Sequence, residues 1–221
     1  VEPSNDEPPV THTKVFHKTY PRFRSLALPE VDKKDSQLET LIEARKSTRE
    51  FTDAPLSMQD LAKILGSCRI VDPDKIPERR TYPSGGARFP VEIYLVSFNV
   101  IGLNPGAYHY DIVGKRLETL LEGDLKIKQR ELISPYLENP AVSVFFTSVI
   151  PRAEVKYGAR AYPYSLIEAG HMGQNMQLAA TEIGVGCCSV SGFVDDTIKG
   201  ILDLTEEEIP IYSIHLGWEK K

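Results

Sequence analysis

The longest hydrophobic pattern in the chain covers residues 164–183. When this segment is wound as a helix, its apolar and small side chains point in nearly every direction around the axis. A helix that is apolar all round is buried between other parts of a protein, so we predict a central helix here. Glu168, His171 and Asn175 form its one polar stripe, at positions i, i+3 and i+7. We interpret His171 as a hydrogen-bonded core histidine beside Glu168 rather than as a metal ligand.

Other helices are predicted from capping patterns that precede apolar residues at helical spacing. Residues 36–39 have the capping-box pattern Ser-Gln-Leu-Glu, which predicts a helix over 36–46. Residues 57–60 open a second helix, in which four apolar side chains share one face: Leu61, Ile64, Leu65 and Cys68. Shorter helices are expected at 125–133 and 195–202.

Strands are predicted between these helices. Residues 91–96 alternate in side-chain direction as a strand does, and segments at 107–110 and 116–121 continue it as an antiparallel meander. Residues 142–150 form an apolar run of strand length, which is typical of a central strand buried on both faces. The last strands are predicted at 187–190 and 209–216.

The order of these elements lacks the regular βαβ spacing of a doubly wound fold. We therefore predict an α+β fold with a mixed, largely antiparallel sheet flanked by helices, as a single domain over residues 36–221. Residues 1–35 carry five prolines among polar and charged groups, which predicts an extended N-terminal arm. Apolar side chains along the arm suggest that it docks on another surface: Val15, Phe16, Tyr20, Phe23, Leu26 and Leu28.

Composition narrows the class of protein. The net charge is −5 over 221 residues, which disfavours binding to nucleic acid or to an anionic membrane. No apolar run approaches the roughly 18 residues that span a bilayer, and residues 1–9 lack the pattern of a signal peptide. The three cysteines, Cys68, Cys187 and Cys188, have no metal-site spacing. We expect no metal, and reduced thiols in a cytoplasmic protein.

Two segments have residue types suited to an anion or a flat ligand. Residues 45–49 read Arg-Lys-Ser-Thr-Arg, and arginine forks and hydroxyls suit phosphate oxygens. The same cations also suit the negative end of a helix dipole, so both interpretations stay open. Residues 82–90 contain Ser84 and the pair Gly85–Gly86, which would let the backbone approach a ligand closely. A tight loop before a strand would have the same composition.

Two further segments could support chemistry. Lys156 and Tyr157 could transfer protons if the lysine were desolvated, although charges four residues apart are also typical of a solvated helical turn. The loop at Ser191 and Gly192 could present main-chain amides to a ligand, or it could be a plain connection.

Taken in order, these segments resemble the nitroreductase superfamily of flavoproteins, and most closely its SagB/ThcOx-type dehydrogenase branch. The similarity runs from Leu38 to Gly217. Five motifs carry it: ARKSTREF (44–51), PSGGARFPVEIY (83–94), KYGARAY (156–162), EAGHMGQN (168–175) and SGF (191–193). Each motif is weak alone, but five in the same order are specific.

The resemblance implies a homodimer that binds FMN in two equivalent clefts at the subunit interface, with the central helix buried there. By position, Arg45, Ser47 and Arg49 correspond to contacts with the FMN phosphate and ribityl chain. Lys46 corresponds to a basic or polar residue beside the flavin.

The remaining motifs imply roles near the flavin ring. One segment would approach the isoalloxazine from the partner subunit: Pro83, Ser84, Gly85 and Gly86. Ser191 and Gly192 would supply main-chain hydrogen bonds near the N5 edge. Lys156 and Tyr157 correspond to the pair that azoline-oxidising members use for proton removal.

The function that the resemblance implies is an FMN-dependent oxidoreductase. It would reduce nitro- or quinone-type electrophiles with NAD(P)H, or dehydrogenate an azoline-type ring in a small or peptide-like substrate. The chain departs from many relatives after Gly217, where they have basic residues that help to hold the phosphate. An alternative is therefore a non-catalytic flavin-binding or scaffold subunit of a peptide-modifying complex.

Overall fold

The computed structural model describes residues 19–30 and 36–220, and the chain divides into one unit up to Ser36 and another from Gln37 onward. Within the first unit, residues 19–30 form no helix or strand. Tyr20, Phe23, Leu26 and Leu28 are exposed there. Val15 and Phe16 lie outside the described residues, so the docking arm stays a prediction.

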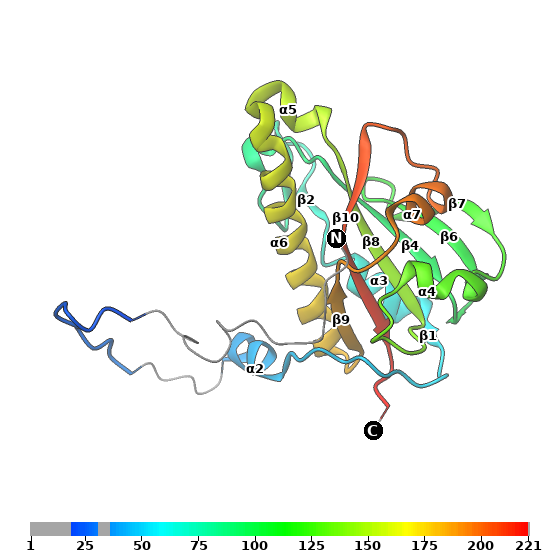
Figure 1. Cartoon of the computed structure of the whole chain (residues 1–221), viewed down its shortest axis with the longest axis horizontal. Helices are drawn as coiled ribbons and strands as arrows, with labels where there is room; N and C mark the ends of the chain where they lie inside the picture. Colours follow the sequence, from blue (N-terminus) through cyan, green and yellow to red (C-terminus); the bar gives the residue numbers. More distant parts are fainter. Residues whose placement is uncertain (1–18, 31–35, 221) are drawn as a thin grey trace. The chain divides into compact units, whose positions relative to one another are not determined.

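The second unit is built on one six-stranded sheet, in which every neighbouring pair of strands is antiparallel (Figure 1). Across the sheet the strands are β7 (Arg116–Glu122), β6 (Gly106–Asp111), β4 (Val91–Ser97), β8 (Val142–Val149), β10 (Glu208–Gly217) and β9 (Gly186–Val190). The predicted meander is present as β4, β6 and β7. Two short pairs lie outside the sheet: β1 (Leu56–Ser57) with β5 (Val100–Ile101), and β2 (Ile70–Asp72) with β3 (Arg79–Arg80).

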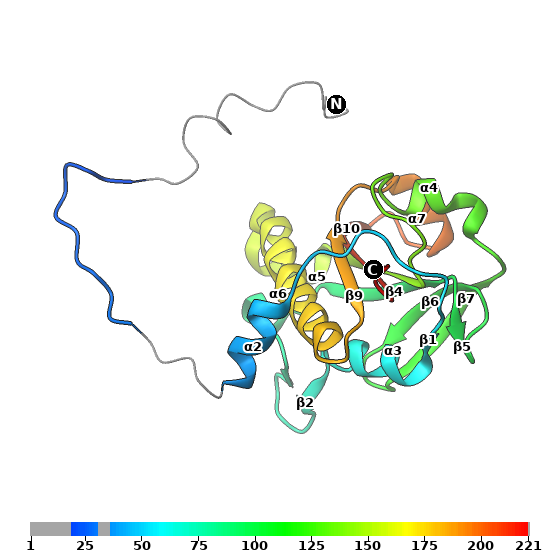
Figure 2. The same cartoon turned by 90° about the horizontal axis from the view of Figure 1, so that it is seen from below.

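β8 is the central strand that the apolar run predicted. Seven of its eight residues are buried, because helices cover both faces of the sheet. Helices α3 (Met58–Leu65) and α6 (Ala161–Glu182) pack on one face, with Val144 and Phe146 of β8 beneath them. Helices α4 (Gln129–Leu132) and α7 (Asp195–Ile201) cover the other face over Phe145. Figure 2 shows α3 and α7 on opposite sides of the strands.

The central helix is only half buried within one chain. α6 has 22 residues, and one of its faces packs on the sheet through Ala169, Met172 and Met176. α2 (Gln37–Ala44) contacts another part of it. The remaining face is open, and Ile167 is 57% exposed. His171 is exposed beside it, so its interpretation as a core histidine is wrong. A spacing of 100° per residue places it on the outer side, four residues from Ile167.

Local chain signals set most of the other boundaries. Ser57 caps α3 in a capping box with Asp60, which fixes the start of that helix as predicted. The helix expected at 125–133 is only a 3₁₀ turn (Lys126–Lys128) followed by α4. An additional helix, α5 (Pro151–Tyr157), precedes α6 and carries Lys156 and Tyr157. No helix within residues 19–30 and 36–220 is both long and apolar enough to cross a membrane.

Candidate active site

The predicted phosphate-binding residues lie along β9, which is an edge strand of the sheet. We call residues 45–49 the basic segment. Its fourth residue, Thr48, is buried and donates its main-chain N–H to the carbonyl of Cys187 at 2.8 Å. Because side chains alternate along an extended chain, Ser47 and Arg49 face away from Thr48, and both are exposed.

The basic segment is held at its far end as well. Glu138 donates its N–H to the carbonyl of Arg49 at 3.0 Å, and Phe51 donates to the carbonyl of Glu138 at 3.1 Å. Lys220, near the C-terminus, donates its N–H to the carbonyl of Glu50 at 3.0 Å. Phe51 itself is buried. The backbone of the segment is therefore fixed at both ends.

The two arginines of the basic segment lie near the β9 cysteines and have no acidic partner. Burial raises the pKa of the Cys187 thiol to about 11, and the charge of Arg45 opposes that rise. Burial also raises the pKa of Cys188, opposed by the charge of Arg49 and a hydrogen bond from Ser47. Among the ion pairs formed within the described residues, none involves Arg45 or Arg49. Lys46 differs, because its Nζ lies 2.6 Å from Oε1 of Glu219.

Ser191 and Gly192 follow directly from β9 and lie beside the same loop as the basic segment. A Cβ atom on Gly192 would be 3.7 Å from Cβ of Ser134, and Ser134 begins the loop that reaches Glu138. A pocket of about 600 Å³ is lined by this loop and by α4, including Ser134 and Glu138. Arg45, Ser47, Arg49, Ser191 and Gly192 are thus brought to one edge of the sheet.

A buried histidine supports the end of β9. Ser213 Oγ donates its one proton to the carbonyl of Val190 at 2.7 Å, so it accepts a hydrogen bond from Nε2–H of His215, 3.1 Å away. Nδ1 of His215 then accepts from Ser143 Oγ at 2.8 Å. Burial lowers the pKa of His215 to about 3, which keeps the ring neutral. Sequence reasoning assigned no role to this histidine.

The second predicted group forms around the glycine turn, by which we mean residues 83–89. Gly86 has a left-handed backbone (φ 59°), and a Cβ atom there would overlap the hydroxyl of Tyr157 and lie 2.7 Å from Nζ of Lys156. Glycine is favoured at such a position, because any other side chain would meet both the backbone strain and these two groups. The structure therefore brings Gly86 together with the predicted catalytic pair, Lys156 and Tyr157.

A pocket of about 250 Å³ lies beside the glycine turn. Its lining comes from the turn and from the first half of α6: Pro83, Ser84, Gly85, Tyr164, Ile167, Glu168 and His171. The rings of Tyr157 and Tyr164 meet edge to face, with centroids 5.0 Å apart. Tyr164 and Glu168 were not predicted as site residues. The polar stripe of α6 was the available signal for Glu168.

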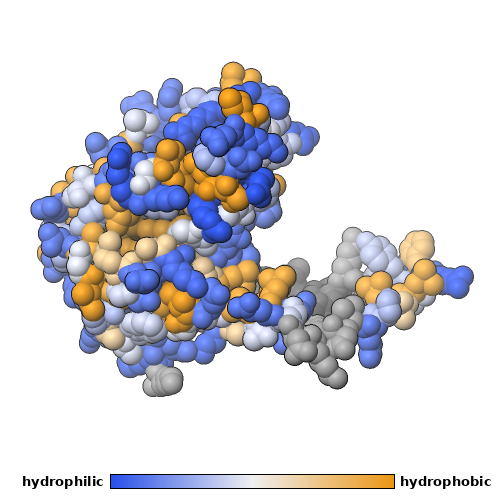
Figure 3. Space-filling model, turned by 180° about the vertical axis from the view of Figure 1, so that it is seen from behind, coloured by the Kyte–Doolittle hydropathy of each residue, from blue (hydrophilic) through white to orange (hydrophobic). Residues whose placement is uncertain are grey.

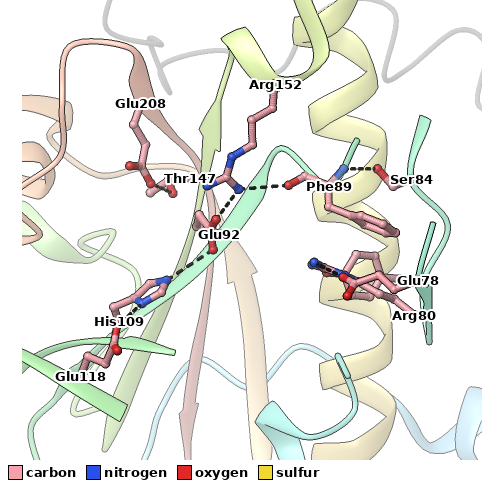
Figure 4. Close-up of polar contacts among 11 residues, drawn as sticks. Glu78, Arg80, Ser84, Phe89, Glu92, His109, Glu118, Thr147, Arg152 and Glu208 are labelled. Carbon is pink, nitrogen blue, oxygen red and sulfur yellow. Dashed lines mark hydrogen bonds and ion pairs between the residues drawn. The ribbon is translucent and has the colours of Figure 1, made fainter. Parts of the chain in front are cut away.

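The start of α5 is tied to the same turn, as Figure 4 shows. Arg152 donates through Nη1 to the carbonyl of Phe89 at 3.2 Å and pairs with Glu92 on β4. Burial raises the pKa of Glu92, but a hydrogen bond from His109 and the nearby Arg152 outweigh that effect and hold the pKa below its ordinary value. The bond to Glu92 in turn raises the pKa of His109, which also contacts Glu118. The pair of Arg152 and Glu92 thus fixes α5 against β4, and His109 continues the contact to β6 and β7.

The two groups of predicted site residues lie far apart within one chain. The glycine turn contacts Tyr164 in the first turn of α6. The basic segment lies by Thr181, in the last turn of α6, where Thr48, Thr181 and Cys187 line one hollow. At 1.5 Å per residue, the 17 residues from Tyr164 to Thr181 span about 25 Å. One chain therefore carries two separate halves of the predicted site.

Comparison with known proteins identifies the family and the fold. Residues 42–218 match the nitroreductase family. The chain belongs to the nitroreductase family. The resemblance drawn from the five motifs is confirmed, and so is the predicted fold class.

Relatives of two kinds are similar to this nitroreductase-family chain. "Putative nitroreductase MJ1384" of Methanocaldococcus jannaschii is 29% identical over 194 residues, which cover 87% of this chain and 95% of the relative. The microcin B17-processing protein McbC of Escherichia coli is 30% identical over 161 residues, or 70% of this chain. The chain spans only 59% of the length of McbC.

Solved structures have the same fold. A chain of the E. coli microcin synthetase McbBCD complex, with truncated pro-MccB17 bound, superposes with a TM-score of 0.84 at 25% identity; the match covers 100% of this chain and 85% of that one. A nitroreductase-like protein of Ralstonia eutropha superposes with a TM-score of 0.73 at 24% identity, with coverage of 88% and 89%.

Members of the nitroreductase family generally bind FMN, and the residues of this chain fit that cofactor. Arg45 and Arg49 are two guanidinium groups that form no ion pair with an acidic side chain of residues 19–30 or 36–220, and the Ser47 hydroxyl lies between them in sequence. Such a donor set suits a phosphate group. The missing side chain at Gly86 leaves the backbone of the glycine turn open to a close neighbour. We find no cluster of metal-ligating side chains within the described ranges.

Proposed function

We propose that this chain is an FMN-dependent oxidoreductase that moves a hydride between flavin N5 and a small or peptide-like substrate. The observation that carries the proposal is the meeting of Lys156, Tyr157 and Gly86 at the glycine turn, because it joins two motifs 70 residues apart into one proton-handling site. When bound, FMN supplies a two-electron acceptor and donor.

The chain's own residues would bind and orient the cofactor and substrate. Arg45 and Arg49 would hold the phosphate through charge-assisted hydrogen bonds, with Ser47 adding a hydroxyl donor. The main-chain amides at Ser191 and Gly192 would bond the ring edge, as the family resemblance implies. Lys46 contributes less in this arrangement, because Glu219 already neutralises its charge.

A complete site requires a second copy of the chain. If two copies pair with their α6 helices antiparallel, the basic segment of one protomer approaches the glycine turn of the other. The two halves that lie about 25 Å apart in one chain then meet at two equivalent sites. The open face of α6 supports this pairing, because Leu166 and Ile167 are exposed there. Apolar side chains also reach the surface at the upper end of Figure 3. Val155 of α5 is 78% exposed.

The direction of the reaction depends on Lys156 and Tyr157. An amine and a phenol side by side can take a proton from one ring atom as hydride leaves the adjacent ring atom, so that a double bond forms between the two; this is the chemistry of azoline-type dehydrogenation. The similarity to the microcin-processing protein McbC favours this direction. In the opposite direction, NAD(P)H would supply the hydride, and the same pair would protonate a nitro- or quinone-type electrophile.

A second candidate is a non-catalytic flavin-binding or scaffold subunit of a peptide-modifying complex. The similarity to a chain of the multi-protein McbBCD complex favours it. The two candidates differ in turnover. An enzyme cycles a donor and an acceptor on its own at rates on the order of 1–10³ s⁻¹, and a scaffold does not.

The deciding experiment is reconstitution with FMN, followed by anaerobic reduction with NADH or NADPH. We expect a yellow protein that bleaches with one donor and turns over with a quinone acceptor. Arg45→Ala combined with Arg49→Ala should weaken FMN binding about tenfold or more, since charge-assisted bonds are lost. Lys115→Ala with Arg116→Ala removes the same charge on β7 and is the control. Equal FMN content in both double variants would refute the assigned phosphate site.

A further inference from the structure

The backbone of the glycine turn is unfavourable on its own. Gly86, Ala87 and Phe89 all have left-handed backbones, with φ of 59°, 52° and 46°. Alanine and phenylalanine rarely adopt this region, because Cβ crowds the following carbonyl. Such residues persist only where the surroundings hold them, so the contacts that fix this turn carry information about function.

Two side chains from different helices hold the turn. Arg152 of α5 donates to the carbonyl of Phe89 at 3.2 Å, and Phe89 donates its N–H to Ser84 Oγ at 2.9 Å. The one hydroxyl proton of Ser84 is then donated to Oε2 of Glu168 on α6. Glu168 is therefore the acceptor at the end of a short chain of hydrogen bonds that begins in the turn (Figure 4 shows Ser84 and Phe89).

Glu168 is an unusual acceptor because it is a carboxyl group in the core. Only 2% of the surface of Glu168 is exposed, and its neighbours along α6, Ile167 and Ala169, are apolar. The other oxygen, Oε1, is buried without a hydrogen-bond partner among the described residues. A glutamine or serine would suffice for a purely structural link, whereas a buried carboxyl is expensive to keep.

The ionisable groups around Glu168 come from four elements. Arg80 of β3 favours its charged form, and Glu92 of β4 disfavours it. Tyr82, which follows β3, is buried nearby, and His171 of α6 lines the same pocket. Burial is the largest effect. The Ser84 hydrogen bond, the charge of Arg80 and a hydrogen bond from the main chain of Val91 only partly oppose it, so the pKa of Glu168 is raised to about 7.

We propose that Glu168 is a positioning residue: its carboxylate, acting through the Ser84 hydroxyl, holds the glycine turn against Lys156 and Tyr157. A hydrogen bond to an ionised carboxylate is roughly twice as strong as one to a neutral acid. Deprotonation of Glu168 therefore tightens the turn, and protonation loosens it. The meaning of this for catalysis rests on the proposed function, but the positioning does not.

The first test measures the group directly in the full chain without added flavin. Carbon-13 labelling of glutamate carboxyls allows each to be titrated by NMR, and the Glu168 signal is the one missing from Glu168→Gln. We expect a midpoint near pH 7. A midpoint below pH 5 would overturn the proposal, because Glu168 would then be ionised throughout the range from pH 6 to pH 8 in which the turn is tested.

The second test measures the turn. Hydrogen exchange of the peptide covering residues 85–89, corrected for intrinsic rates, should show protection rising several-fold between pH 6 and pH 8 in the wild type. Glu168→Gln keeps an oxygen that can accept from Ser84 but cannot ionise, so its protection should not change with pH. Glu182→Gln, at the other end of α6, should behave like the wild type. If Glu168→Gln follows the wild-type pH profile, the proposal is wrong.

A further variant covers the case in which Glu168→Gln folds poorly. Ser84→Ala removes the link while leaving the carboxyl in place, so protection should fall at both pH values and the Glu168 midpoint should move upward. Unchanged protection in Ser84→Ala would contradict the link. Because none of these readouts uses FMN, a chain that binds no flavin would refute the proposed function and leave this inference intact.

Discussion

A single missing side chain determines how closely Lys156 and Tyr157 approach the glycine turn. At Gly86, a Cβ atom would occupy the space of the Tyr157 hydroxyl and crowd Lys156 Nζ. Both atoms are at the far ends of flexible side chains, so they can move away without unfolding the protein. We therefore expect Gly86→Ala to disturb chemistry more than stability.

Gly184→Ala is the control that separates two effects of Gly86→Ala: the strain of a left-handed alanine and the contact with Lys156 and Tyr157. Gly184 is also left-handed, with φ 74°, but a Cβ atom there meets nothing within 4 Å. Both variants should lose about 1–2 kcal/mol in urea unfolding, because a left-handed alanine costs that much. Only Gly86→Ala should also lower the turnover of the reconstituted protein, by tenfold or more. Equal turnover in the two variants would show that the contact with Lys156 and Tyr157 is unimportant.

At the level of residues, the sequence could predict which side chains suit a binding or catalytic role, but not all of the residues that contact them. The double glycine and the Lys-Tyr pair were visible as motifs, and the structure joins them. Lys46 was predicted to lie beside the flavin, and its pairing with Glu219 from the other end of the chain was not predicted. The role of Glu168 depends on Ser84, which is 84 residues away. Contacts at such separations follow from the fold and not from local spacing.

The basic segment is an element whose position depends on a close contact with the last strand. A Cβ atom on Gly217 of β10 would lie 2.9 Å from Cδ1 of Phe51 and 3.0 Å from its Cβ. Phe51 is buried, so neither group can yield easily. We expect Gly217→Ala to cost about 1–3 kcal/mol as overpacking, and to weaken FMN binding by displacing the basic segment.

The matched control for this element is Gly200→Ala in α7. Gly200 is helical, and a Cβ atom there meets nothing within 4 Å. It should therefore stabilise the chain by about 0.5–1 kcal/mol, through helix propensity, with FMN affinity unchanged. Urea unfolding and FMN titration of both variants check the prediction. Gly217→Ala with wild-type FMN affinity would mean that the contact with Phe51 does not position the basic segment.

Elements with strong local patterns were predictable, and those formed by tertiary contacts were not. The apolar run of β8 and the capping box of α3 each settle their own structure. α5 begins at Pro151 and has one buried residue, Ala153, so it has no apolar stripe to detect. The short strand β3 forms within a segment rich in Pro, Arg and Asp because β2 pairs with it.

At the scale of the whole molecule, the two half-sites and the open face of α6 lead to the same expectation. The sequence pattern of α6 is apolar all round, but one chain buries only part of it. This mismatch between pattern and burial is resolved if a second copy covers the open face, and only then do the basic segment and the glycine turn meet. The apolar pattern of α6 in the sequence and the separation of the two half-sites in the structure are independent observations, and both favour a dimer.

The last prediction tests that agreement. The wild type should sediment at twice its 24.7 kDa mass, and Ile167→Glu, which places a charge on the open face of α6, should shift it toward the monomer. FMN affinity should fall with dimer content, since each site needs both protomers. Val113→Glu is the control, because Val113 is 72% exposed in the turn between β6 and β7, and it should change neither quantity. A wild-type monomer that binds FMN tightly would contradict the shared site, since one chain keeps its two halves about 25 Å apart.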